Sequence, residues 1–181
     1  STWPNNKPMD KLLRGIVDFS KTGAKNYLEW IKKANSAGGA HSLIITCVDS
    51  RVCPTSFTQC GPGSFFMVKT PGNFVPTLDE ITSDTAGFHD CTLATMDLTF
   101  NALGIKNAVV CGHSDCKVNV LQQLCTIRRY PFMHDARLKI QLFGLWIDLD
   151  LAQVHMFSPQ QQRFIPVTND NLDSLIRQPS L

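Results

Sequence analysis

Three side chains that could act together at a metal ion lie within five residues of one another. They are the thiol of Cys47, the carboxylate of Asp49 and the guanidinium of Arg51. They follow an apolar run, residues 42–46, that is typical of a buried strand. Open α/β sheets bind their ligands at the carboxyl ends of their strands, so these side chains occupy a position suited to chemistry.

A second pair of metal-binding residue types, His113 and Cys116, follows another apolar run at residues 107–110. Catalytic zinc sites use three protein ligands and leave a fourth position open. One loop can bring His113 and Cys116 to a single ion, and Cys47 at a neighbouring strand tip can supply the third ligand. The alternative is a core histidine near a buried thiol. The paired placement at two strand ends favours zinc.

Asp49 and Arg51 are two residues apart in a loop, a spacing that allows a charge-assisted ion pair. A carboxylate beside zinc can occupy the fourth coordination position or accept a hydrogen bond from a zinc-bound water. Arg51 would decide between these states by holding Asp49 away from the metal. The alternative, a surface salt bridge of little energetic value, does not explain why Cys47 lies two residues before Asp49.

Composition and charge exclude several classes of protein. The chain has 181 residues, of which 43% are hydrophobic and 18% charged, as in globular domains with a hydrophobic core. A formal net charge of +2 gives no reason to expect a nucleic-acid partner. No apolar run reaches about 18 residues, so we expect no membrane insertion.

The cysteines indicate a reducing, intracellular compartment. There are seven, an odd number, in a chain too large to need disulfide bonds for stability. No C-x-x-C pair exists, so a closed structural site of four thiolates is not expected and a thiol redox function is disfavoured. Cys111, at the end of a predicted strand, and Cys125, on a helix-like stretch, are expected to be small core residues.

Apolar spacing predicts an α/β fold, with a mostly parallel central β-sheet flanked by helices and an N-terminal helical arm. We expect residues 1–8 to form a flexible arm and residues 9–181 a single domain. Gly23 is expected to break the helical arm, and Asn169 or Asp170 to cap a last short helix. The predicted buried strands are residues 42–46, 65–68 and 108–111, followed by an edge pair or hairpin at 143–151 and 154–157; the predicted helices are residues 9–19, 24–37, 54–59 and 89–103, and a segment after Cys116.

Three stretches resemble the β-class carbonic anhydrases, in the family's order and at close to its separations. They are residues 47–51, 62–73 and 111–116. Residues 12–15 and 157–166 are similar to the animal branch of that family. The resemblance covers about residues 9–168, and its combination of C-x-D-x-R with H-x-x-C is highly specific.

The resemblance implies a zinc-dependent lyase. This enzyme would reversibly hydrate carbon dioxide to bicarbonate and a proton, by attack of zinc-bound hydroxide. It also implies a homodimer or higher homo-oligomer whose N-terminal helices embrace the partner, and a mitochondrial location with the cytosol as the alternative. The implied residues are Cys47, His113 and Cys116 as zinc ligands, Asp49 and Arg51 as the catalytic dyad with Asp49 as a conditional fourth ligand, and Phe66 and Gly72 as substrate contacts.

The sequence also departs from the family pattern. The usual Arg-Asn-Ala-Gly-Asn begins here with Lys69 and contains Pro71, and Leu98 replaces the usual tyrosine. The segment between Cys116 and the last strands is shorter than in relatives. These changes leave a rival hypothesis, a low-activity or non-catalytic zinc-binding relative that acts as a binding or structural module. A third hypothesis is hydrolysis of carbonyl sulfide or carbon disulfide at a similar site.

Overall fold

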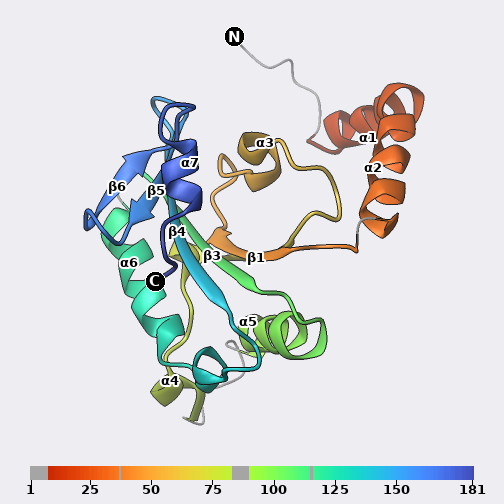
Figure 1. The fold of residues 1–181 in the computed structure, drawn as a ribbon. Helices are drawn as coiled ribbons and strands as arrows, with labels where there is room; N and C mark the ends of the chain where they lie inside the picture. The colour runs from red at the N-terminus through yellow and green to blue at the C-terminus, as the bar shows by residue number, and fades with distance from the viewer. Residues whose placement is uncertain (1–7, 37, 83–89, 115) are drawn as a thin grey trace.

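The fold is built on a six-stranded sheet with the strand order β2-β1-β3-β4-β5-β6 (Figure 1). The computed structural model describes residues 8–36, 38–82, 90–114 and 116–181. β1, β2, β3 and β4 run parallel, and β5 and β6 are antiparallel additions at one edge. The strands are β1 (Ser42–Cys47), β2 (Phe66–Thr70), β3 (Asn107–His113), β4 (Gln141–Asp148), β5 (Gln153–Ser158) and β6 (Arg163–Pro166).

Helices connect and cover these strands, which confirms the predicted α/β class with a mostly parallel sheet. The long helix α6 (Lys117–Arg128) joins β3 to β4 and packs against both strands. The other segments are α1 (Pro8–Asp18), η1 (Phe19–Gly23), α2 (Ala24–Ser36), α3 (Pro54–Thr58), η2 (Pro71–Asn73), α4 (Leu78–Thr82), α5 (Asp90–Asp97), η4 (Leu98–Ala102), η5 (Pro131–His134) and α7 (Leu172–Ile176).

The hydrophobic core forms where the central strands meet α6 and the segment that follows α5. Every residue of β1 is buried, as expected for a central parallel strand. Leu43 of β1, Val110 of β3 and Leu142 of β4 are fully buried, together with Phe100 of η4 and Leu124 of α6. This packing fixes the strands whose carboxyl ends carry the predicted metal ligands.

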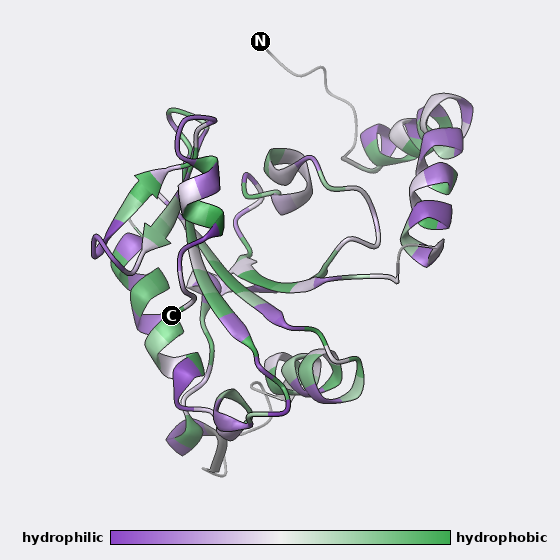
Figure 2. Cartoon of the chain, viewed as in Figure 1, coloured by the Kyte–Doolittle hydropathy of each residue, from purple (hydrophilic) through white to green (hydrophobic). Residues whose placement is uncertain are grey.

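The N-terminal helices stand away from the sheet (Figure 1). No residue of α2 is buried. Figure 2 shows hydrophobic and hydrophilic residues interspersed along the two helices of the arm, and several of the hydrophobic ones are exposed. Leu12 is 61% exposed, Ile16 60% and Leu28 57%. An apolar surface of this kind is unusual on an isolated chain and marks an interaction site.

The predicted break at Gly23 is wrong. The chain passes from α1 to α2 through η1, a π-helical segment whose flanking residues Asp18 and Ala24 both have right-handed helical backbone angles. The amide of Ala24 donates to the carbonyl oxygen of Phe19, so the i→i+5 bond absorbs the change of helix register. The Phe19 and Tyr27 rings also meet edge to face across this segment, with centroids 5.6 Å apart.

Four details at the periphery also differ from expectation. β2 was predicted to be buried, but as an edge strand it alternates between half-buried and exposed residues. Cys111 is buried as predicted, whereas Cys125 is exposed because it lies on the outer side of α6, next to buried Leu124. The cap of α7 is Asn171, because a turn from Thr168 to Asn171 delays the start of the helix. β6 was not predicted.

Two further expectations concern the N-terminal arm and membrane insertion. The predicted N-terminal arm, apart from Pro8, lies outside the described residues. Within the part of the chain that the structure describes, no helix combines the length and the apolar character needed to cross a membrane.

Candidate metal centre at the strand tips

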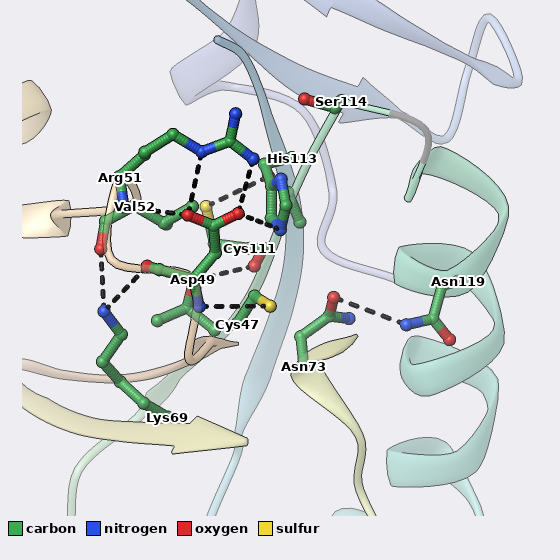
Figure 3. Close-up of polar contacts among 12 residues, drawn as sticks. Cys47, Asp49, Arg51, Val52, Lys69, Asn73, Cys111, His113, Ser114 and Asn119 are labelled. Carbon is green, nitrogen blue, oxygen red and sulfur yellow. Dashed lines mark hydrogen bonds and ion pairs between the residues drawn. The ribbon is translucent and has the colours of Figure 1, made fainter. Parts of the chain in front are cut away.

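The centre lies where two neighbouring parallel strands end. β1 ends at Cys47 and β3 at His113, and their pairing sets Thr46 opposite Cys111. The hydroxyl of Thr46 donates to the carbonyl oxygen of Cys111 at 2.9 Å and ties the two strands together there. Cys47 and His113 are both buried, and the close-up shows them on the same side of the Asp49 carboxylate (Figure 3). The sheet therefore brings together residues 66 positions apart in sequence.

Asp49 and Arg51 form the predicted ion pair with bidentate geometry. Arg51 Nε donates to Asp49 Oδ1 at 3.0 Å, and Nη2 donates to Oδ2 at 2.7 Å. The backbone amide of Arg51 adds a third hydrogen bond to Oδ1 at 2.9 Å. These hydrogen bonds from Arg51 hold the pKa of the Asp49 carboxyl well below its usual range. Asp49 is therefore a carboxylate, and only an acceptor, at neutral pH.

The same bidentate Asp–Arg ion pair, called the fork below, occurs at a second place on this chain. Asp135 and Arg137 have the same spacing, with Arg137 Nε 2.9 Å from Oδ1 and Nη2 2.6 Å from Oδ2. Hydrogen bonds from Arg137 lower the pKa of Asp135 to about 2. The fork is thus a local property of Asp-x-Arg in a loop, and it does not by itself identify a catalytic pair.

What distinguishes Asp49 is its surroundings. Its Oδ2 lies 3.9 Å from Nε2 of His113, and its backbone amide donates to Cys47 Sγ at 3.5 Å. The amide of Asp49 thus points at the sulfur that is predicted to bind the metal. Cys47, Asp49, Arg51 and His113 therefore form one contact group, as Figure 3 shows.

His113 gives the clearest sign that a partner belongs in this group. Its side chain is 11% exposed, and both ring nitrogens are buried without a hydrogen-bond partner. Buried polar atoms in folded proteins are nearly always paired, so this ring needs an explanation. An imidazole nitrogen beside a buried thiol matches the donor preference of zinc, and the residues present fit that ion.

Cys116 lies in the turn that follows His113. Its backbone amide donates to the His113 carbonyl oxygen at 2.9 Å, and its side chain is partly buried. Within residues 8–36, 38–82, 90–114 and 116–181, no three side chains of histidine, cysteine, aspartate or glutamate are gathered closely enough to hold a metal ion. The set Cys47, His113 and Cys116 therefore stays a prediction.

The two predicted substrate contacts lie at opposite ends of β2. Cys47 pairs with Thr70, so Gly72, two residues beyond, lies at the same carboxyl end of the sheet as the centre. Its φ of 62° lies in the left-handed region, which favours glycine. Phe66 pairs with Leu43, four residues back along the strand, or roughly 13 Å from the level of Cys47. It packs against the core instead. The structure does not bring Phe66 to the Asp49 group.

Polar residues of α6 hold the Gly72 loop, and the sequence reasoning missed them. Asn119 donates its side-chain amide to the carbonyl oxygen of Gly72, and Gln123 donates to Asn119 Oδ1 at 3.0 Å. Gln123 also accepts from the amide of Val75 at 2.8 Å. The apolar spacing that predicted this helix gives no weight to amide side chains, although their i, i+4 spacing indicated a shared face.

Lys69 is a further residue whose role the sequence did not reveal. Its ammonium donates to the carbonyl oxygen of Val52 at 2.9 Å and to that of Asp49 at 3.4 Å (Figure 3). It thus fixes, from β2, the loop that presents Asp49 and Arg51. The sequence shows that Lys69 keeps the positive charge of the arginine in the family pattern. It does not show the partners of the ammonium group, because these are backbone oxygens of residues 17 and 20 positions earlier in the chain.

Comparison with known proteins agrees with this geometry. The family model described as carbonic anhydrase matches residues 42–118, the stretch that contains all five residues of the predicted centre. Beta carbonic anhydrase 1 of Caenorhabditis elegans is 34% identical over 117 residues, which are 64% of this chain and 43% of the nematode protein. A carbonic anhydrase of Helicobacter pylori is 28% identical over 66% of this chain and 53% of its own length. The chain thus spans about half the length of these relatives.

Solved structures extend the likeness to the fold. The β-carbonic anhydrase CcaA matches with a TM-score of 0.75 at 20% identity, over 89% of this chain and 100% of its own. The Coccomyxa β-carbonic anhydrase matches with a TM-score of 0.67 at 16% identity, over 92% and 91% of the two chains. At these identities the likeness concerns the fold. The family model, the sequence relatives and the solved structures point the same way: residues 42–118 are similar to carbonic anhydrases, and the fold resembles that of the β-class enzymes.

Proposed function

We propose that this chain reversibly hydrates carbon dioxide to bicarbonate and a proton, with zinc held by Cys47, His113 and Cys116. The observation that carries the proposal is the buried His113 ring, which has no hydrogen-bond partner and lies beside the Asp49 carboxylate. When bound, zinc supplies a water acidic enough to lose a proton near neutral pH. The family relationship supplies the substrate class.

The Asp49–Arg51 pair has two tasks in this proposal. The hydrogen bonds from Arg51 keep the Asp49 carboxylate charged and in one orientation. A remaining lone pair of the carboxylate can then accept a hydrogen bond from a group at the centre. The same bonds restrain Asp49 as a conditional fourth ligand, since turning toward the metal would break contacts to Arg51. Arg51 therefore selects between an open and an occupied fourth position.

The proposed substrate contacts are Gly72 and Phe66. Gly72 lies at the edge of the centre, held by Asn119, and we retain it as a substrate contact. Phe66 remains a predicted contact whose position in β2 is remote from Cys47 in the same chain. A second chain would have to place it beside the substrate.

The rival function is a zinc-binding relative with little or no turnover. Leu98, where the family pattern has a tyrosine, is 48% exposed and offers no hydroxyl. The occurrence of the same ion-pair geometry at Asp135 and Arg137 shows that the fork alone does not require catalysis. These observations favour testing turnover directly.

We also propose that the working unit is a homodimer or larger homo-oligomer, joined through the N-terminal helices. The apolar residues of α1 and α2 are exposed along an arm that projects from the sheet (Figure 2). A second copy of the chain would cover them. One solved chain, from a structural study of two tetrameric β-carbonic anhydrases of Sordaria macrospora, matches with a TM-score of 0.66 at 16% identity.

We place the protein inside the cell, in the mitochondrion by family resemblance and with the cytosol as the alternative. All seven cysteines are free thiols. Exposed thiols such as Cys53, Cys91 and Cys125 persist in a reducing compartment. Subcellular fractionation would separate the two locations.

Replacing Asp49 tests the activity itself. Stopped-flow measurement of carbon dioxide hydration by the zinc-loaded chain should show catalysis, and Asp49→Ala should lower kcat/KM about 10²- to 10⁴-fold, as for other lost acid–base groups. Asp135→Ala is the matched control, because it removes the same ion pair from a remote loop, and it should leave the rate unchanged. An inactive wild type would support the non-catalytic rival, and the same assay with carbonyl sulfide would test the third hypothesis.

Replacing Lys69 tests the support of the dyad loop. Lys69→Met removes both hydrogen bonds to the loop and should lower kcat about 10- to 100-fold, because small displacements of reacting groups are costly. Lys69→Arg should recover much of the rate, since its guanidinium can reach the same carbonyl oxygens. Lys139→Met, at an exposed position before β4, is the control. Equal rates in Lys69→Met and wild type would show that the loop needs no anchor.

Placing a charge on the arm tests the oligomer. Ile16→Glu should reduce the sedimentation coefficient from that of an oligomer to that of a monomer of about 20 kDa, because the carboxylate would be buried in the interface. Ile176→Glu on α7 is the matched control, since that isoleucine is 70% exposed. A monomeric wild type, or an Ile16→Glu variant of unchanged size, would contradict this mode of assembly.

A further inference from the structure

Trp146 of β4 contacts the turn that carries His113 and Cys116. Its indole Nε1–H donates to the carbonyl oxygen of Ser114 at 2.6 Å. The amide of Ser114 in turn donates to the carbonyl oxygen of Ile147 at 3.1 Å. Two consecutive residues of β4 therefore hold both backbone polar groups of Ser114.

Ser114 is a position where such support has a purpose. Its φ of 42° lies in the left-handed region, which a residue with a Cβ adopts only at an energetic cost. It lies between the two predicted ligands of the turn, next to His113 in the close-up (Figure 3). Without its two partners on β4, the turn could relax and carry Cys116 away from His113.

The Trp146 ring makes a second contact, with the residue that follows Cys116 in the sequence. The ammonium of Lys117, the first residue of α6, lies 3.7 Å from the centroid of the indole, a cation–π distance. The His155 ring, opposite Trp146 on β5, lies 4.7 Å from the indole by centroids and helps to fix its position. Trp146 itself is 5% exposed. One rigid side chain thus touches residues before and after Cys116.

Packing at Gly112 restricts the turn from another direction. Gly112 pairs with Trp146 across β3 and β4. A Cβ at this position would lie 2.5 Å from Val120 Cγ2 and 3.3 Å from the Cβ of Cys116. The start of α6 therefore lies close against β3, which leaves no room for a side chain at Gly112.

We infer that Trp146 is a positioning residue for the metal centre, which holds Ser114 and Lys117 so that Cys116 is aimed at the same ion as His113. This inference rests on the proposed zinc site. Groups that orient metal ligands in this way typically contribute 10- to 100-fold to metal affinity.

The experiment compares zinc binding by wild type, Trp146→Phe and Trp30→Phe. Trp146→Phe keeps a ring for Lys117 and loses the N–H donor. Trp30→Phe is the matched control, since Trp30 also has a lysine ammonium near its ring, that of Lys33 at 5.2 Å, but lies on α2. Zinc affinity is measured by chelator competition, and the ligand set by the thiolate-to-metal charge-transfer absorption of the cobalt(II)-substituted chains.

Trp146→Phe should bind zinc 10- to 100-fold more weakly, with weaker thiolate-to-cobalt absorption, and Trp30→Phe should match wild type. Lys117→Met, an exposed substitution, should weaken zinc binding about two- to fivefold and tests the ring contact if Trp146→Phe fails to fold. Wild-type affinity and spectra in Trp146→Phe, or in Lys117→Met when Trp146→Phe is unfolded, would overturn the inference. Failure of the wild type to bind zinc would instead overturn the proposed site.

Discussion

The parallel pairing of β1 with β3 is the constraint on which the candidate centre depends. It places Cys47 and His113 at adjacent strand tips, although they are far apart in sequence. The buried core beneath them fixes the two strands, so the sheet holds the two predicted ligands rigidly. The loops after the strands only have to aim side chains over short distances, and hydrogen bonds from neighbouring strands do this at Asp49 and at Ser114.

Context, not the ion pair, gives the centre its chemical character. Asp49–Arg51 and Asp135–Arg137 have nearly the same geometry and the same direction of pKa shift. Only Asp49 has a buried imidazole within 4 Å and a backbone amide that donates to a cysteine sulfur. The difference is the buried imidazole of His113 beside Asp49, whose ring nitrogens have no hydrogen-bond partner. A metal ion would bind such a nitrogen, whereas, among the described residues, Asp135 has no buried imidazole beside it.

Much of this arrangement could be predicted because strand-end chemistry is local in sequence. Apolar runs predicted β1 and β3, and the candidate ligands were found among the residues that follow these runs. Contacts that depend on tertiary structure could not be read this way. The anchoring of the dyad loop by Lys69, the exposure of Cys125 and the remoteness of Phe66 from Cys47 follow from strand order, helix orientation and register. The helical path through Gly23 depends on a π-type hydrogen bond that periodicity does not reveal.

X-ray absorption at the zinc edge, on chain purified without added chelator, tests the central claim most directly. We predict one zinc per chain, with two sulfur neighbours at about 2.3 Å and nitrogen or oxygen atoms completing four-coordination. The sulfur count should fall to one in Cys47→Ser and in Cys116→Ser. A chain without stoichiometric zinc, or a zinc shell with no sulfur or with four sulfurs, would contradict a centre built from Cys47, His113 and Cys116.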